Sequence, residues 1–219
     1  MVKDFFQRNI VRDSSKLLTA NVWAQGISFL AYLVLTRLFS KEEFALYNIF
    51  YSFIEIFIIL STCKYELSIV VADNHREASA IARLTFRLNM VVSVFLLLLI
   101  LILHFFFPHF RYSPISSHLE ICLLIPVMVF FCGTTRVFTH LFNRFRQYSQ
   151  IAISEALTAT SGVLMKILFG IGKSLPFLHS IGLPLGTVIG KMAGNINYLF
   201  EEYELTPVNL PERAADDDR

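Results

Sequence analysis

The chain has 219 residues, of which 55% are hydrophobic and 16% are charged, with a net charge of +2 and a mean hydropathy of +0.58. Soluble domains average about 25% charged residues and could not bury this much apolar surface, so the composition excludes an ordinary soluble fold. The small net charge does not indicate a nucleic-acid partner. Cys63, Cys122 and Cys132 lack metal-ligand spacing, and we expect them to pack as small apolar side chains.

Six apolar segments follow one another along the chain, each close to the roughly 20 residues that a membrane-spanning helix needs. They cover residues 17–39, 44–63, 86–107, 119–140, 151–172 and 181–200. The sequence therefore predicts an all-α polytopic membrane protein with about six transmembrane helices. We expect residues 1–16 to form a cytoplasmic segment, residues 17–200 the transmembrane lobe, and residues 201–219 a disordered polar tail.

Basic residues are distributed unequally between the two sides of these segments. Eleven Lys and Arg residues lie before the first segment, around the connection from the second to the third, or at the end of the fourth, whereas four lie at the alternate connections. Cytoplasmic loops carry an excess of Lys and Arg, so we expect both termini to be cytoplasmic. Arg136 and His140 lie one turn apart near the cytoplasmic end of the fourth segment, where we expect them to anchor the helix at the interface.

A row of polar residues follows the first apolar segment at steps of three or four, which places them on one face of a helix. This polar stripe consists of Asn21, Gln25, Ser28, Tyr32 and Thr36. Unsatisfied polar groups in hydrocarbon cost several kcal/mol each, so a membrane helix turns such a face towards partner helices or water. We interpret the polar stripe as one wall of a cavity, and interhelical hydrogen bonding is the alternative.

Polar residues also share helix faces in the second, fifth and sixth segments. The rows are Tyr47, Tyr51 and Glu55; Glu155, Thr158, Gly162 and Lys166; and Thr187, Lys191, Asn195 and Tyr198. Ionisable residues inside a membrane usually line a pathway or pair with one another, although long lysine side chains can also reach the interface. The residues that we predict to line the cavity from these segments are Tyr51, Glu55, Glu155, Lys166, Lys191 and Asn195.

Glycine recurs every four residues in the sixth segment, at Gly182, Gly186, Gly190 and Gly194. Small residues at this spacing let two helix backbones approach closely. We therefore predict that this face packs against another helix.

No motif in the sequence indicates catalysis. Gly-rich phosphate loops, HExxH sequences, nucleophile elbows and paired His/Cys sets are missing, and no connection exceeds about 25 residues. We therefore predict no enzymatic activity, no cofactor and no metal site.

Four segments match longer patterns, in order, over about residues 15–200. Residues 36–45 are similar to T-R-L-[YF]-[ST]-P-E-[DE]-F-G, and residues 64–71 are similar to R-Y-E-x-A-I-V-L. Residues 143–154 are similar to N-R-x-[KR]-x-[FY]-x-x-[LI]-A-x-S, and residues 182–191 are similar to G-L-I-x-G-x-x-x-G-Q. These patterns resemble those of bacterial polysaccharide biosynthesis proteins, the lipid-linked oligosaccharide flippases of the multidrug/oligosaccharidyl-lipid/polysaccharide exporter superfamily. The chain departs from these patterns at Lys41, Ala45 and Lys191, where the family usually has Pro, Gly and Gln, respectively.

The resemblance implies a transporter in which two pseudo-symmetric six-helix lobes enclose a cavity that opens alternately to the cytoplasm and the periplasm. Its cargo would be an undecaprenyl-pyrophosphate-linked oligosaccharide that crosses the bacterial inner membrane for polysaccharide or O-antigen biosynthesis. The amide and phenol side chains of the polar stripe would contact the sugar headgroup, and Lys166 and Lys191 would attract the diphosphate. Glu55 and Glu155 would be candidates for ion coupling.

The six predicted segments correspond to one such lobe. We therefore expect a truncated N-terminal lobe, embedded in membrane lipid, that pairs with a separate second lobe or with another copy of itself. The alternatives are a truncated remnant that does not transport, and a drug/cation antiporter of the same superfamily.

Overall fold

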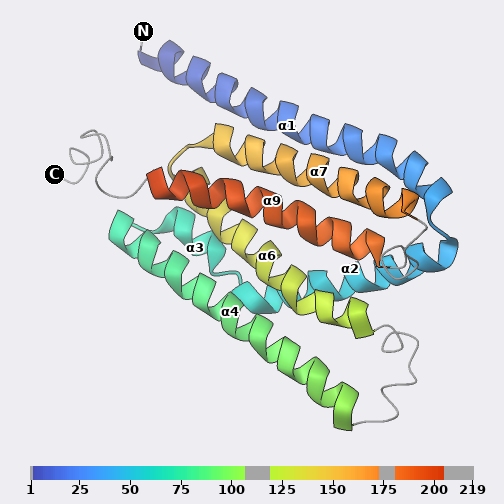
Figure 1. The fold of residues 1–219 in the computed structure, drawn as a ribbon. Coiled ribbons are helices and arrows are strands. Elements are labelled where there is room, and N and C mark those ends of the chain that lie inside the picture. Colours follow the sequence, from blue (N-terminus) through green and yellow to red (C-terminus); the bar gives the residue numbers. More distant parts are fainter. Residues whose placement is uncertain (1, 107–118, 173–180, 205–219) are drawn as a thin grey trace.

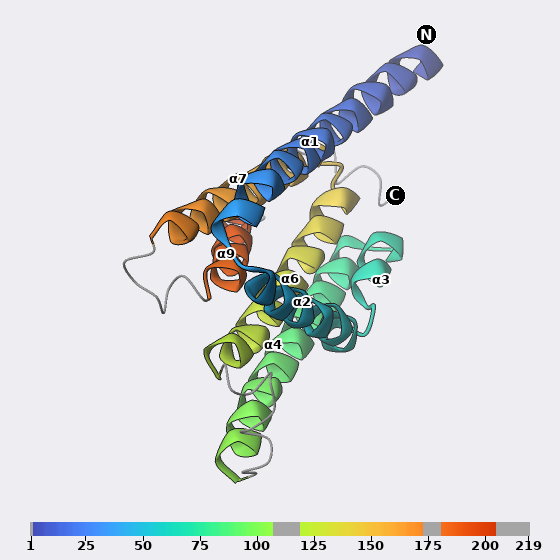
Figure 2. The ribbon, with the colours of Figure 1, turned by 90° about the vertical axis from the view of Figure 1, so that its right-hand side faces the viewer.

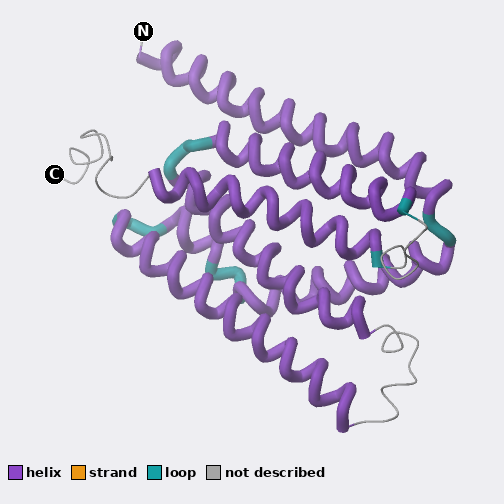
Figure 3. The backbone as a smooth tube through the Cα atoms, viewed as in Figure 1, coloured by secondary structure: helices purple, strands orange, loops and turns teal. Residues whose placement is uncertain are grey.

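The computed structural model describes residues 2–106, 119–172 and 181–204, without the side chains of residues 2–17, 20, 21 and 201–204. Helices make up almost all of this described part, and it contains no strand (Figure 1, Figure 3). The helices are α1 (Val2–Leu38), α2 (Lys41–Thr62), α3 (Glu66–Val71), α4 (His75–Phe106), α6 (Leu119–Arg144), α7 (Tyr148–Ile171) and α9 (Gly182–Glu204).

The predicted all-α membrane fold is confirmed. The helices α2, α4, α6 and α7 are each long and apolar enough to cross a membrane, and Val22–Leu38 of α1 is a shorter apolar stretch. Each of the six predicted spans falls on one of the long helices. The sixth span coincides with α9, which is less apolar because it contains Lys191, Asn195 and Asn197. Its crossing of the membrane stays a prediction.

The predicted division of the chain at residue 16 stays a prediction. The α1 helix is continuous from Val2 to Leu38, so the basic N-terminal residues belong to the same helix as the polar stripe. Residues 205–219 of the predicted tail lie outside the described residues.

A capping box sets the start of α2. The Ser40 hydroxyl accepts a hydrogen bond from the Glu43 backbone N–H at 3.2 Å, and the Ser40 N–H donates to the Glu43 carboxylate at 2.7 Å. These bonds satisfy backbone donors that the first turn of a helix leaves free. Phe39 is buried beside Gly170 and Gly182, where an added Cβ would come within 2.9 Å and 3.2 Å of its ring. This corner therefore fixes the start of α2 against α7 and α9.

The central helix is α6, which contacts α2, α3, α4, α7 and α9. A large buried apolar cluster combines Phe50, Ile54 and Ile58 of α2 with Met128 and Val129 of α6. Lipid tails are as apolar as these side chains. In a membrane the cluster therefore stabilises the bundle mainly by van der Waals packing rather than by the hydrophobic effect.

The glycines of α9 face α7 along the length of the contact. A Cβ added at Gly190 would lie 2.7 Å from the Thr158 carbonyl oxygen and 2.8 Å from the Gly162 Cα. A Cβ at Gly194 would overlap the Thr158 hydroxyl, and one at Gly186 would lie 2.9 Å from the Lys166 backbone nitrogen. The predicted packing role of these glycines is therefore confirmed.

The helices form two groups that are joined through α6 and α9. One group places α1, α7 and α9 side by side, and the other contains α2, α3, α4 and α6 (Figure 1, Figure 2). The beginnings of α1 and α4 and the ends of α6 and α9 lie at the same end of the bundle, on the left in Figure 1. We call this the basic end, because it contains the basic residues of the start of α4 and the end of α6.

Candidate functional site

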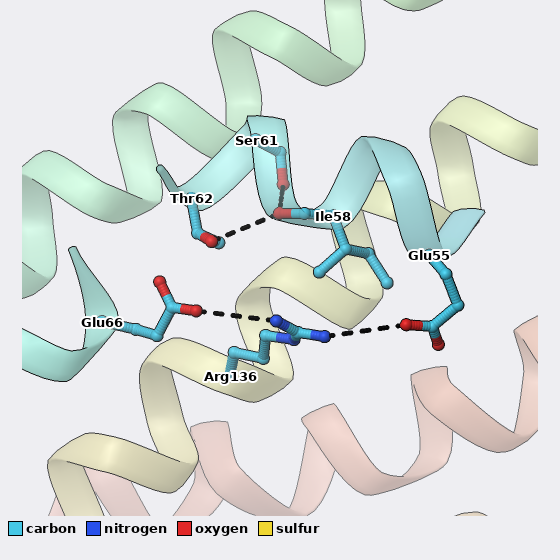
Figure 4. Close-up of polar contacts among 6 residues, drawn as sticks. All are labelled: Glu55, Ile58, Ser61, Thr62, Glu66 and Arg136. Atoms are coloured by element: carbon cyan, nitrogen blue, oxygen red, sulfur yellow. Dashed lines mark hydrogen bonds and ion pairs between the residues drawn. The ribbon is translucent and has the colours of Figure 1, made fainter. Parts of the chain in front are cut away.

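Arg136 of α6 lies between two carboxylates that come from different helices (Figure 4). Its Nη1 is 3.6 Å from Oε1 of Glu66, and its Nη2 is 4.0 Å from Oε2 of Glu55. Glu55 belongs to α2, and Glu66 belongs to the first turn of α3. A single guanidinium therefore connects three helices.

The two carboxylates differ sharply in exposure. The Glu66 side chain is 2% exposed, whereas the Arg136 and Glu55 side chains are 31% and 50% exposed. A buried carboxylate without its cation is strongly destabilising, whereas an exposed ion pair contributes little. Arg136 therefore has one partner that the fold requires and one partner that it can release at small cost.

The path of the chain after α2 brings Glu66 to Arg136. Cys63 and Lys64 both have left-handed backbone conformations, with φ of 47° and 62°. Such conformations are unfavourable for residues other than glycine, and two in succession end the helix and redirect the chain. The hydroxyls of Ser61 and Thr62 donate to the Ile58 carbonyl at 3.0 Å and 3.2 Å, beside this break (Figure 4).

Arg144 of α6 holds the other end of α3. Its Nη1 donates to the backbone carbonyls of Ile69, Val70 and Ala72 at 3.1 Å, 3.3 Å and 2.6 Å. The last carbonyls of a helix have no partner within the helix, and a positive charge there also interacts favourably with the helix dipole. Arg136 and Arg144 together therefore fix the short α3 against α6.

Further ionisable residues gather near Arg136. Cys132, one turn earlier on α6, interacts electrostatically with Lys191 of α9 as well as with Glu55 and Arg136. Lys191 also interacts with Glu155 of α7. We use the name charged cluster for this set, which consists of Glu55, Glu66, Arg136, Glu155 and Lys191. It brings together groups from five helices, so only the folded chain creates it.

Tyr51 lies at the edge of the charged cluster. It is one turn before Glu55 on α2, is 42% exposed and interacts electrostatically with that carboxylate. Among the predicted cavity residues, Tyr51, Glu55, Glu155 and Lys191 therefore lie in one neighbourhood.

Lys166 lies apart from the charged cluster, in a junction between α2, α7 and α9. Its Nζ donates to the Tyr47 hydroxyl at 3.3 Å and lies 5.1 Å from the centre of the Tyr47 ring. The same hydroxyl is 3.2 Å from Thr187 Oγ1. These contacts combine a hydrogen bond with a cation–π interaction, so Lys166 joins three helices.

Asn195 is buried between α9 and α6, with an exposed fraction of 3%. Its Nδ2 donates to the Phe131 carbonyl at 2.9 Å, and its Oδ1 accepts from the Thr135 hydroxyl at 3.1 Å. The buried Tyr198 is similarly 3.2 Å from the Thr139 hydroxyl. This face of α9 therefore forms interhelical hydrogen bonds with α6.

The polar stripe of α1 is exposed wherever its side chains are described. Gln25, Ser28, Tyr32 and Thr36 are all exposed, and the side chain of Asn21 lies outside the described part. Ser28 and Thr36 donate to carbonyls of their own helix at 2.6 Å and 3.0 Å. Among the described side chains of α1, Ala31 and Leu35 are buried, and they pack with Phe39, which follows the helix, beside α7 and α9. Within the described residues, the polar stripe from Gln25 to Thr36 is therefore exposed.

Two residues of the site escaped the sequence interpretation. We expected Arg136 to anchor α6 at the membrane interface, which stays a prediction, but we did not expect its ion pairs. Glu66 belonged only to one of the family-like patterns. An arginine inside an apolar segment needs a countercharge, and this rule could have prompted a search among the acidic residues. It could not have selected Glu66, because the break at Cys63 and Lys64 decides which acidic residue reaches α6.

The comparison with protein families gives one match. A family model described as polysaccharide biosynthesis protein matches residues 10–209. Members of this family are typically membrane transporters rather than enzymes. No curated protein and no solved structure matches the chain.

Proposed function

The chain belongs to the polysaccharide biosynthesis protein family, and we propose that it is part of a flippase for lipid-linked, diphosphate-bearing oligosaccharides. It would act in the bacterial inner membrane with both termini in the cytoplasm, and it would make or break no bond. The observation that supports this proposal most directly is the unequal sharing of Arg136 between a buried and an exposed carboxylate.

Arg136 is suited to bind a diphosphate by exchange. A guanidinium binds phosphate oxygens through charge-assisted, often bidentate hydrogen bonds, which exceed a weak and exposed carboxylate contact. The diphosphate would displace Glu55, while the buried Glu66 would keep the guanidinium in place. Lys191 would supply a second cation from α9. Once released, the Glu55 carboxylate would be free to take up a proton or a cation, which would couple substrate binding to ion movement.

The polar stripe would serve the sugar part of the cargo. Gln25 and Tyr32 present exposed hydrogen-bonding groups that suit sugar hydroxyls. A polar face exposed to hydrocarbon is unfavourable, so we propose that a second lobe, or a second copy of this chain, lies opposite it. Cross-linking of Gln25→Cys in a Cys63→Ser background tests the second copy, with Leu30→Cys on the opposite face of α1 as its control. Equal cross-linking of the two variants would contradict the pairing.

A binding experiment tests the phosphate role. The chain is reconstituted in nanodiscs and titrated with a fluorescent oligosaccharide linked to a polyprenyl diphosphate. We expect Lys191→Gln to weaken binding by about 10-fold or more, because a hydrogen bond to a charged group contributes about 1.5–3 kcal/mol. Lys41→Gln removes the same charge at the exposed start of α2 and serves as the matched control. Equal affinities of these two variants would reject the role of Lys191.

A transport experiment separates binding from coupling. Proteoliposomes that contain the labelled lipid are treated with a membrane-impermeant quencher, and the accessible fraction is followed with time. We expect Glu55→Gln to bind the cargo at least as tightly as the unmodified chain, because it removes a competitor for Arg136. The same variant should lose transport. Weaker binding by Glu55→Gln would refute the exchange of partners.

A further inference from the structure

A groove at the basic end of the bundle shares no residue with the charged cluster. It lies between α4, α6 and α9 and has a volume of about 370 Å³. Pockets that hold small molecules usually measure about 300–1,000 Å³. The groove is therefore large enough to receive part of a ligand, and it has no role in the transport mechanism proposed above.

The lining of the groove is divided into a charged part and an apolar part. Arg83 and Arg87, one turn apart on α4, supply the charge, and both are exposed. Phe86, Phe138, Leu141 and Leu199 supply apolar surface from all three helices. Among the described residues, neither arginine has a carboxylate within ion-pair distance. Within the described part of the chain, the groove therefore presents two arginines without a carboxylate partner above an apolar floor.

The position of Arg87 along α4 places these cations at the level of lipid headgroups. The segment from Leu88 to Phe106 contains no charged residue apart from the titratable His104. At 1.5 Å per residue, the 19 residues from Leu88 to Phe106 span about 28 Å, close to the thickness of the hydrocarbon core of a bilayer, about 30 Å. When the apolar part of α4 occupies the hydrocarbon, Arg87 lies at the boundary and Arg83 lies one turn outside it.

We propose that this groove binds an anionic phospholipid. The lipid phosphate would lie between Arg83 and Arg87, and the beginning of an acyl chain would lie on Phe86, Leu141 and Leu199. Basic pockets between transmembrane helices at the cytoplasmic surface suit anionic headgroups. A zwitterionic lipid carries its own cation beside the phosphate and gains less from two arginines. The groove thus holds a structural lipid rather than the cargo.

Native mass spectrometry of the purified chain in detergent tests this proposal. Titration with phosphatidylglycerol and with phosphatidylcholine gives a dissociation constant for each lipid. We expect a clear preference for phosphatidylglycerol. Each basic residue near an anionic lipid contributes about a fivefold gain in affinity, so Arg83→Gln with Arg87→Gln should weaken phosphatidylglycerol binding about 25-fold. The affinity for phosphatidylcholine should change little.

Two further variants make the test specific. Arg76→Gln removes the same charge from the exposed first turn of α4, outside the groove, and should leave the affinity unchanged. Leu199 is 54% exposed, so Leu199→Gln should weaken lipid binding without disturbing the fold. Equal losses in Arg76→Gln and the double variant would overturn the proposal, because they would show general electrostatic attraction. Displacement of phosphatidylglycerol by glycerol phosphate, or by polyprenyl phosphate at equal concentration, would also overturn it.

Discussion

Replacement of Gly190 by alanine tests whether the contact between α7 and α9 depends on bare backbone. The added Cβ would meet three backbone atoms, the nearest being the Thr158 carbonyl oxygen at 2.7 Å. Ordinary contact begins at 3.4 Å, so the two helices would have to separate by about 0.7 Å locally. Overpacking of this kind costs about 1–3 kcal/mol. No flexible side chain can move away to reduce it.

Gly26 provides the matched control, because a Cβ there would meet nothing within 4 Å. Alanine favours a helix over glycine by about 1 kcal/mol at either position. This gain cancels when Gly190→Ala is compared with Gly26→Ala, so the difference isolates the cost of overpacking. We expect Gly190→Ala to be less stable than Gly26→Ala by about 1–3 kcal/mol.

Reversible unfolding in mixed detergent micelles, with SDS as the denaturant and circular dichroism as the signal, measures this difference. Equal free energies of unfolding for the two alanine variants would refute the close backbone packing of α7 on α9.

Three other substitutions address the polar contacts between helices. Arg136→Met should lower the free energy of unfolding by about 3–5 kcal/mol, because the buried Glu66 loses its cation. Arg144→Gln should speed amide hydrogen exchange in α3 without affecting α7, because α3 loses a ligand for three carbonyls. Tyr47→Phe should lower the free energy of unfolding by about 1 kcal/mol, because Lys166 loses a hydroxyl partner and keeps only the ring.

The controls for these variants follow from the same contacts. Glu55→Gln should cost less than about 1 kcal/mol, since that ion pair is exposed and long, and a cost equal to that of Arg136→Met would contradict the unequal sharing. Arg37→Gln, at the exposed end of α1, is the charge-matched control for Arg144, and equal exchange in both variants would contradict the capping of α3. For Tyr47, an unchanged stability would show that the hydroxyl contributes nothing to the junction.

The shared arginine suggests why a short helix interrupts the bundle after α2. A carboxylate on α2 alone would leave the guanidinium with an exposed and weak partner. Glu66 on α3 supplies a buried partner, and Arg144 secures α3 from its other end. The α3 helix thus keeps Arg136 in position while Glu55 stays exchangeable. The unfavourable backbone at Cys63 and Lys64 is offset by these contacts.

The sequence by itself determined the fold class, the positions of the long helices and the family. The membrane-spanning helices can be recognised as long apolar segments of the sequence. A helix in lipid must pair its backbone hydrogen-bonding groups internally and needs about 20 apolar residues to cross the hydrocarbon. The glycine spacing of α9 was equally readable, since a period of four residues places small residues on one face of a single helix.

Only the tertiary structure decided which polar groups meet. The same periodicity describes Lys191, which joins the charged cluster, and Asn195, whose amide group is hydrogen-bonded to α6. Periodicity places a residue on a face but does not say which helix covers that face. The ion pair of Arg136 and Glu66 depends on Cys63 and Lys64, whose left-handed backbone conformations turn the chain after α2. No local sequence pattern predicts the direction of this turn. Contacts between distant helices arise from packing, and packing is a property of the folded bundle.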